Sequence, residues 1–584
     1  MKLSDYIISF LRREGISCIF EVCGGSITHI LDSLYGKKDI KAVSMHHEQT
    51  AAFAAEGYSR TSENLGVAMA TSGPGATNLI TGIGSAFFDS IPSLFITGQV
   101  NTYEFKFDKR VRQLGFQETD IAKIVKPIVK EAHLIRKPDR IRYYLERSVH
   151  IARSGRPGPV LLDIPMNVQR AEINPSRLKA FALKKISSPR LSKKAVCKVA
   201  ALIRSSNRPV ILVGGGVRLS GAQDELLKLL DATGIPIVSS LMGLDICPHD
   251  NSSFMGMIGA YGNRYANLAA ANADMILALG TRLDTRQTGT TPSTFAREAK
   301  IVHVDIDHNE IGHKIKPAIG VAADIKQFLR ALNGRLEGYD RTQIAPWIKA
   351  VKVYKKKYLS FKIPSDGRIL PNLFMSKLSD RLPDNAIICV DVGQHQMWAA
   401  QSLKIKSGQR FITEGGMGSM GSSLALAIGA SFAKPDKTVV VITGDGGFQV
   451  NIQELETVKH HKLNIKIILL NNNGYGMIRQ FQKQYFNSRF QSTVIGYSQP
   501  DFQAVVSAYK IPAIKISRDS QIKKALNSFF KKSGPSFLEI YIGKDELVLP
   551  KLSVNKPIEE QDPQLPPKEL KTNMFIKLLS EKDR

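Results

Sequence analysis

Acidic and amide side chains follow two apolar runs in the stretch VVVITGDGGFQVNIQELETVKHHKLNIKIILLNNNGYG, residues 439–476. Asp445 lies between glycines directly after the first run, and Asn472 follows the second run. In an open parallel sheet, ligands bind beyond the carboxyl ends of the strands. A carboxylate, an amide oxygen and a main-chain carbonyl suit Mg²⁺ when phosphate oxygens and water complete the coordination. Two ordinary turns are the alternative, but the pair on successive strands predicts a site for magnesium and a diphosphate.

A second candidate is Glu48, in the stretch HHEQTAAFAAEGYSR. A carboxyl group in a dry pocket has a raised pKa and can exchange a proton with a bound ligand. A glutamate that begins a helix can also merely complement the helix dipole. Without neighbouring motifs, this second interpretation is favoured.

Helical patterns alternate with short apolar runs around these residues. The runs include ISCIFEV, LGVAMAT, SLFITG and PVLLDIP, and later PVILVGG, IPIVSS, MILALG and IVHVDID. This alternation is typical of parallel sheets covered by helices, and the chain of 584 residues is too long for one core. We therefore predict an α/β protein with three doubly wound parallel-sheet domains, at residues 1–170, 190–336 and 366–550. The proline-rich tail, residues 551–584, is predicted to be irregular.

The composition is that of a globular protein, with 43% hydrophobic and 23% charged residues. The net charge of +28 is spread along the chain, so we expect a basic solvated surface and no nucleic-acid partner. No apolar run approaches the roughly 20 residues that span a bilayer, and the N-terminus has the pattern of an amphipathic helix, not of a signal peptide. We expect a cytoplasmic, soluble protein with no membrane partner. The five cysteines lack metal-ligand spacing and fit a reducing compartment.

The motif GDG followed by NN after the next strand resembles the cofactor motif of thiamine-diphosphate enzymes. The resemblance extends from Met1 to about Pro550 and, within that family, is to the large catalytic subunit of the acetolactate (acetohydroxyacid) synthases. The segments that carry it are HHEQTAAFAAEGYSR, ATSGPGATNLITGI, DSIPSLFITGQV, GFQET, SGRPGPVLLDIP, VGQHQMWAAQ and EGGMGSMG. It implies that the first domain binds the pyrimidine of thiamine diphosphate and the third binds the diphosphate and Mg²⁺.

The resemblance also implies roles for individual residues. Asp445, Asn472 and the carbonyl of Gly474 would hold the metal. Glu48 would exchange a proton with the pyrimidine ring, and Gln117 would lie beside the substrate. The other residues that would contact thiamine diphosphate are Gly25, Pro74, Asn78, Gly393, Gln394, His395, Gly418, Met420, Gly446 and Gly447.

Two further implications concern the loop GGMGSMG and the assembly. Gly418 and Met420 match the family positions that bend the cofactor into its reactive shape. Family members build each site from the first domain of one subunit and the third domain of another. The resemblance therefore implies a homodimer or homotetramer with shared active sites, and a small regulatory subunit is a further candidate partner.

The middle domain carries a weaker signal. VILVGGG is a glycine turn after a strand but does not form GxGxxG. SLMGL, ALGTRLDTR, VDID and AADI match segments that line an FAD site in acetolactate synthases, although some relatives leave this domain empty or bind another nucleotide. A bound FAD would be structural, because the reaction has no net redox step. The residues implied to contact FAD are Gly214, Gly215, Gly216, Leu241, Met242, Gly280, Arg282, Asp284, Arg286, Asp305 and Asp324.

Several positions depart from the acetolactate synthase pattern. Met166 replaces a lysine, and Phe481 and Gln482 replace a tryptophan and a glutamate. The family's GMHG appears as GAYG at residues 259–262, and Cys23 replaces a proline. Because the lysine and the tryptophan line the substrate entrance in the family, we expect an intact thiamine site with a different acceptor pocket.

The resemblance implies a carboligase that decarboxylates pyruvate and adds the two-carbon unit to a second 2-keto acid. The products would be acetolactate or acetohydroxybutyrate, in branched-chain amino acid biosynthesis. The alternative is transfer of the same unit to another carbonyl acceptor, such as a nucleotide-linked keto-sugar. A catalytically inactive, nucleotide-binding homologue is disfavoured because Glu48, Asp445 and Asn472 are all present.

Overall fold

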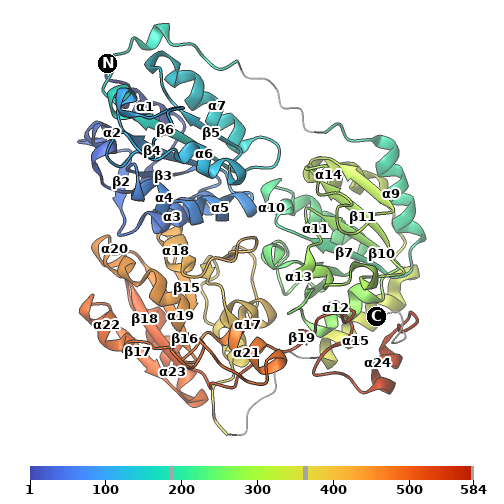
Figure 1. Cartoon of the computed structure of the whole chain (residues 1–584). Coiled ribbons are helices and arrows are strands. Elements are labelled where there is room, and N and C mark those ends of the chain that lie inside the picture. The colour runs from blue at the N-terminus through green and yellow to red at the C-terminus, as the bar shows by residue number, and fades with distance from the viewer. Residues whose placement is uncertain (183–188, 359–365, 580–584) are drawn as a thin grey trace.

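The computed structural model describes residues 1–182, 189–358 and 366–579. These residues form three domains, each around a six-stranded sheet (Figure 1). Every strand pairing within the three sheets is parallel. The predicted α/β class with three parallel-sheet domains is confirmed.

The first sheet has the strand order β2-β1-β3-β4-β6-β5. Three of its four inner strands, β3, β4 and β6, are buried along their whole length, because helices cover both faces and continuous apolar runs suit such strands. The strands are β1 (Cys18–Val22), β2 (Lys41–Ser44), β3 (Gly66–Ala70), β4 (Ser93–Gln99), β5 (Glu131–Leu134) and β6 (Pro159–Pro165). The main helices are α1 (Leu3–Arg13), α3 (Glu48–Ser62), α5 (Ile80–Phe88) and α7 (Ile141–Arg153).

The middle sheet has the order β12-β11-β10-β7-β8-β9. Its strands are β7 (Pro209–Val213), β8 (Ile237–Ser239), β9 (Phe254–Met257), β10 (Met275–Leu279), β11 (Lys300–Asp305) and β12 (Ile319–Ala322). The main helices are α9 (Lys193–Ser205), α11 (Gln223–Thr233), α12 (Arg264–Ala271), α14 (Ile325–Arg335) and α15 (Ala345–Lys357).

The third sheet has the order β14-β13-β15-β16-β18-β17, so the two strands that precede Asp445 and Asn472 are neighbours. Its strands are β13 (Ile387–Val390), β14 (Arg410–Thr413), β15 (Val439–Gly444), β16 (Ile465–Asn471), β17 (Ala513–Ile516) and β18 (Ser536–Tyr541). Its main helices are α16 (Pro371–Ser379), α17 (Gln394–Ser402), α18 (Ser422–Ala433), α21 (Gly476–Tyr485), α22 (Phe502–Ala508) and α23 (Ile522–Lys531). All eighteen strands of the three sheets fall within the predicted domain ranges, whose boundaries stay predictions.

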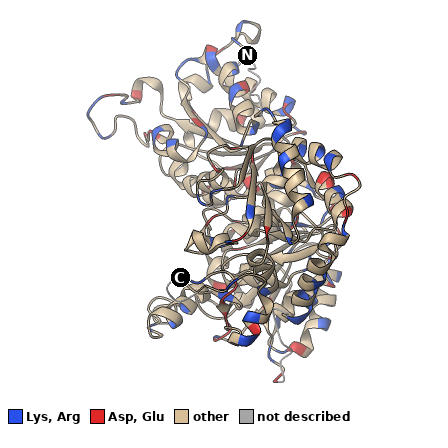
Figure 2. Cartoon of the chain, turned by 90° about the vertical axis from the view of Figure 1, so that its right-hand side faces the viewer, with Lys and Arg blue, Asp and Glu red and all other residues tan. Residues whose placement is uncertain are grey.

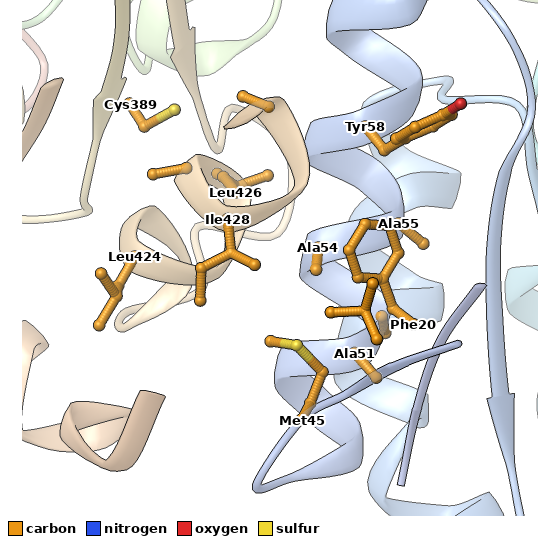
Figure 3. Packing of buried hydrophobic residues seen from close by; sticks show 14 of the residues in the cluster. Phe20, Met45, Ala51, Ala54, Ala55, Tyr58, Cys389, Leu424, Leu426 and Ile428 are labelled. Atoms are coloured by element: carbon orange, nitrogen blue, oxygen red, sulfur yellow. The ribbon is translucent and has the colours of Figure 1, made fainter. Parts of the chain in front are cut away.

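Helices α3 and α18 join the first and third domains (Figure 3). Each helix contributes a glycine where the two backbones meet. A Cβ on Gly57 would lie 2.1 Å from the Leu426 carbonyl oxygen, and one on Gly429 would lie 1.8 Å from the Ala54 oxygen. One apolar core runs through both domains around this crossing, and it includes Phe20, Leu426 and residues of both sheets. This packing fixes the N-terminus of α3, where Glu48 lies, relative to the third sheet.

The tail is more ordered than the sequence predicted. It forms the short antiparallel pair β19 (Lys551–Leu552) and β20 (Gln561–Asp562) and the helix α24 (Pro567–Asn573). Leu552 and Ile558 lie in the core of the middle domain, and Glu559 pairs with Arg297 at 2.7 Å. The sequence missed this because isolated apolar residues among prolines have no periodicity to reveal what they pack against.

Lysine and arginine side chains are distributed along the molecule, with acidic residues among them (Figure 2). Among the described residues, no helix is both long and apolar enough to cross a membrane.

Candidate active site

Asp445 and Asn472 lie at the carboxyl ends of β15 and β16, as the sequence predicted. Asp445 is 2% exposed, and its Oδ2 accepts hydrogen bonds from the Gly474 N–H at 2.8 Å and the Tyr497 hydroxyl at 2.6 Å. Burial raises the pKa of Asp445, and these two donors oppose the rise. No sequence motif marked Tyr497.

Three oxygen atoms face one another at this point. The side-chain oxygen of Asn472 lies 2.9 Å from the Gly474 carbonyl oxygen and 3.1 Å from Asp445 Oδ1. Its amide nitrogen donates to Gln394 Oε1 at 2.8 Å. The reverse orientation of the Asn472 amide would place its oxygen against Gln394 Oε1, which is another acceptor. The Gln394 side chain is itself oriented by its amide nitrogen, which donates to the Gln480 side-chain oxygen at 3.2 Å. Three acceptors without a proton between them repel unless a cation lies among them, and this donor set fits Mg²⁺.

Gly393, Gln394 and His395 lie at the start of α17, beside these strand ends. His395 packs against two glycines: a Cβ on Gly444 would lie 2.8 Å from its Nδ1, and one on Gly393 would lie 2.5 Å from its Cε1. Burial lowers the pKa of His395 to about 3, so the ring is neutral. Its Nε2 is buried and has no partner among the described residues. A group bound at these strand ends would supply one.

Asp391 was missed by the sequence analysis although it also follows a strand, β13. Its Oδ1 accepts from the Gly421 N–H at 2.8 Å, and its Oδ2 accepts from the Ser423 hydroxyl at 2.8 Å. These bonds tie the loop that carries Gly418 and Met420 to the sheet.

The two predicted glycines after Asp445 pack closely against other side chains. A Cβ on Gly446 would lie 2.5 Å from the Tyr475 ring, and one on Gly447 would lie 3.2 Å from Asp391.

Glu48 lies in a second cluster, in the first domain. Its Oε2 accepts from the Asn78 side-chain amide at 2.9 Å. A Cβ on Gly75 would lie 3.2 Å from Glu48 Oε1, and one on Gly73 would lie 3.0 Å from the Gln117 Cβ. The structure therefore brings Glu48, Asn78 and the turn before Asn78 together and places Gln117 against the same turn.

Gly25 and Pro74 adjoin this cluster. Ser26, next to Gly25, shares a hydrogen bond with Thr71 between their hydroxyls at 2.8 Å and accepts from the Ser72 N–H at 2.8 Å. Pro74 begins the short helix α4 (Pro74–Asn78). The turns after β1 and β3 thus lie side by side, as neighbouring strands of a parallel sheet require.

Gln117 is held in a strained loop, with φ at 63°. The loop is anchored by Gln99, whose amide nitrogen donates to the Thr119 carbonyl at 2.7 Å and to Asp163 Oδ2 at 2.9 Å. Asp163 is buried within β6 and also accepts from the Thr97 hydroxyl at 2.8 Å. Asp163 therefore supports the Gln117 loop through Gln99.

The Asp163→Asn variant is expected to gain stability over the wild type as the pH rises. Burial raises the pKa of Asp163 to about 7, whereas an unfolded aspartate titrates near about 3.9. Between these values only the folded state holds the proton, so wild-type stability falls with rising pH. Asparagine removes this dependence, and the difference in unfolding free energy should grow by up to about 1.4 kcal/mol per pH unit.

Urea unfolding followed by circular dichroism, at several pH values between about 4 and 8, measures this difference. The exposed Asp139, in the same domain, provides the matched control Asp139→Asn, which makes the same substitution without removing a buried carboxyl. A flat profile for Asp163→Asn would show that the buried carboxyl does not titrate in this range.

All eleven residues predicted to contact FAD line one cavity of about 490 Å³. Gly214 and Gly216 line the cavity at positions where a side chain would not fit. A Cβ on Gly214, for example, would lie 2.2 Å from the Gly280 carbonyl oxygen. Burial raises the pKa of Asp305, at the end of β11, to about 6. The sequence did not predict that the first and third domains also line the cavity, through Asp89, Arg156, Met397 and Gly415.

Comparison with known proteins matches each of the three domains to a domain of one enzyme family. Models of the thiamine pyrophosphate enzymes match residues 1–124 (N-terminal TPP binding domain), 196–332 (central domain) and 391–540 (C-terminal TPP binding domain). Acetolactate synthase 2, chloroplastic, of Nicotiana tabacum is 38% identical over 562 residues, which cover 94% of this chain and 83% of the relative. The acetolactate synthase large subunit of Cyanidium caldarium is 36% identical over 565 residues, 94% of each chain.

This chain belongs to the acetolactate synthase family. The family is also represented by the probable acetolactate synthase large subunit of Methanocaldococcus jannaschii, 38% identical over 560 residues, 94% of this chain and 93% of the relative. The first and third domains, which hold the Glu48 and Asp445 clusters, match the two TPP binding domains of the family.

The residues that depart from the acetolactate synthase pattern lie on different domains. Met166 begins the short helix α8 (Met166–Gln169) of the first domain, and Phe481 lies on α21 of the third. Phe481 is 43% exposed, and the Lys551 ammonium lies 5.8 Å from the centre of its ring. Gln482 accepts from the Thr493 hydroxyl at 2.6 Å. The exposed Phe481 is available to a substrate or to another chain.

Proposed function

We propose that this chain is the catalytic subunit of a thiamine-diphosphate-dependent acetolactate synthase. It decarboxylates pyruvate and adds the two-carbon unit to a second 2-keto acid, in branched-chain amino acid biosynthesis. The observation that carries the proposal is the group of three facing oxygens from Asp445, Asn472 and Gly474, at the edge of a TPP binding domain. The reaction is inferred from the relatives, which are named acetolactate synthases.

Each cluster has a distinct task in this reaction. When bound, thiamine diphosphate supplies the nucleophilic carbon at which pyruvate loses carbon dioxide. Asp445, Asn472 and the Gly474 carbonyl would hold Mg²⁺, and the buried His395 Nε2 would contact the diphosphate. Glu48 exchanges a proton through Oε1, which receives no hydrogen bond from the described residues, while Asn78 holds Oε2.

FAD is proposed as the occupant of the middle-domain cavity. The cavity volume of about 490 Å³ is within the range of cofactor sites. Asp305 Oδ1 accepts from the Asp307 N–H at 2.9 Å, and its other oxygen can accept from a ribose hydroxyl. A purified protein with a flavin absorption spectrum would support this assignment, and a colourless protein that does not bind added FAD would contradict it.

A homodimer or homotetramer with shared active sites is part of the proposal. Large apolar side chains are exposed beside both clusters. Phe116, next to Gln117, is 84% exposed, and Ile495 is 64% exposed. Ile495 lies in the chain between Thr493, whose carbonyl oxygen would be 2.8 Å from a Cβ on Gly474, and Tyr497, which donates to Asp445. Two relatives are named large subunits, so a small regulatory partner is also proposed. A cytoplasmic location stays a prediction, and the absence of disulfides among the five cysteines is consistent with it.

The decisive experiment incubates purified protein with thiamine diphosphate, Mg²⁺ and labelled pyruvate, and identifies the products by mass spectrometry. We expect carbon dioxide and acetolactate from pyruvate alone, and acetohydroxybutyrate when 2-oxobutanoate is added. Release of carbon dioxide only in the presence of another carbonyl compound would contradict the proposal.

A second acceptor class is kept because of Met166 and Phe481. Both replace residues that line the substrate entrance in acetolactate synthases, and methionine removes a positive charge that could bind a keto-acid carboxylate. A nucleotide-linked keto-sugar needs no such charge at its carbonyl end. Including such a sugar in the same assay separates the two functions, since only a sugar transferase would form the sugar adduct faster than acetolactate.

A further inference from the structure

The turn Glu414–Gly416 lies between the two proposed cofactor sites. It follows β14 and leads into the loop that carries Gly418 and Met420. Asp89, at the end of α5, accepts hydrogen bonds from the Gly415 N–H at 2.9 Å and from the Gly416 N–H at 2.7 Å. Two backbone groups of the third domain are therefore held by one carboxylate of the first domain.

Arg60 reinforces this contact from α3. Its guanidinium pairs with Asp89 at 2.8 Å and with Glu56 at 2.9 Å, and it donates to the Thr413 carbonyl at 2.6 Å. The Asp89 side chain is 2% exposed and that of Arg60 is 7% exposed. Charge-assisted hydrogen bonds are stronger than neutral ones, and burial reduces their screening by water. The position of the turn is thus set by a buried ion pair.

Apolar atoms also pack against the turn. A Cβ on Gly415 would lie 2.4 Å from Met242 Sδ, and one on Gly416 would lie 2.5 Å from the Phe88 Cβ. Asp89, Met242, Phe88 and Gly415 all line the middle-domain cavity. A ligand in the cavity consequently meets the same residues that hold the turn.

We propose that Asp89 is a positioning residue through which a nucleotide in the middle-domain cavity strengthens binding of thiamine diphosphate. A ligand that packs against Phe88, Asp89 and Met242 stabilises the turn Glu414–Gly416 that these residues contact, and the turn places the Gly418–Met420 loop for the cofactor. This inference rests on the proposed function, because it takes that loop to contact thiamine diphosphate. Coupling of this kind is reciprocal, so thiamine diphosphate strengthens nucleotide binding by the same factor.

The test measures the dissociation constant of thiamine diphosphate in the presence of Mg²⁺ by quenching of protein fluorescence, on protein freed of nucleotide, with and without saturating FAD. For the wild type we expect FAD to tighten binding by about fivefold or more. Asp89→Asn loses a charge-assisted acceptor, so the dissociation constant of thiamine diphosphate for this variant should rise about tenfold. FAD should change that constant by less than about twofold.

Asp274→Asn is the matched control. Asp274 also accepts from two backbone N–H groups, of Asn207 at 2.7 Å and of Arg208 at 3.0 Å, but it lies before β10, at the opposite edge of the middle sheet from the cavity. It should retain wild-type coupling. Gly416→Ala tests the same contact without removing a charge, because the added methyl group meets the Phe88 Cβ, and it should also lose the coupling.

The results separate this inference from the proposed function. Wild-type protein that binds both cofactors without coupling, or an Asp89→Asn variant that keeps full coupling, overturns the inference alone. Wild-type protein that shows the coupling but makes no acetolactate overturns the proposed function alone. Protein that does not bind thiamine diphosphate overturns both.

Discussion

Glu48→Gln is expected to lower the rate of acetolactate formation by about 10²–10⁴-fold, the usual contribution of a general acid–base group. Glutamine has nearly the same shape and can keep the contact with Asn78, but it cannot exchange a proton at Oε1. Thiamine diphosphate should therefore still bind, with its dissociation constant within a few-fold of the wild type. Steady-state rates and a fluorescence titration on the same preparation measure both quantities.

Glu63→Gln is the matched control for this variant. Glu63 is the exposed C-cap residue of α3, so its replacement tests the same substitution at the other end of that helix. It should leave the rate unchanged. Full activity of Glu48→Gln would refute the proton-exchange role, whereas loss of cofactor binding in step with the rate would indicate a binding role.

Asp445→Ala is expected to weaken Mg²⁺-dependent binding of thiamine diphosphate by more than about a hundredfold. Removing a metal ligand should cost more than losing a residue that only orients one, which already costs about 10–100-fold. The variant also removes the charge that balances the cation beside Asn472 and Gly474. Titration with thiamine diphosphate at several Mg²⁺ concentrations measures the effect.

Asp501→Asn controls for loss of an aspartate in the same domain. Asp501 caps α22 and accepts from the Gln503 N–H at 2.9 Å, away from the three oxygens. It should bind metal and cofactor as the wild type does. If Asp445→Ala keeps the wild-type dependence on Mg²⁺, the three oxygens do not form the metal site.

The sequence alone determined the three parallel-sheet domains and the family. Strands buried on both faces must be continuous apolar runs, and VVVIT and IKIILL are visible as such without a structure. Asp445 and Asn472 could be placed at one site because they directly follow neighbouring strands, and the family resemblance added the Gly474 carbonyl. The residues that line the middle-domain cavity came from the family resemblance of SLMGL, ALGTRLDTR, VDID and AADI, because the glycine turn alone does not form GxGxxG.

Only the tertiary structure decided which distant residues meet. Nothing near Asp391 or Tyr497 in the chain reveals that they bind the Gly421 N–H and Asp445, and no periodicity reveals that Leu552 joins the middle-domain core. The contact of Asp89 with Gly415 joins residues of two domains. The physical reason is that periodicity and turn residues report how each segment folds locally, whereas these contacts depend on how helices and sheets pack, which local patterns do not encode.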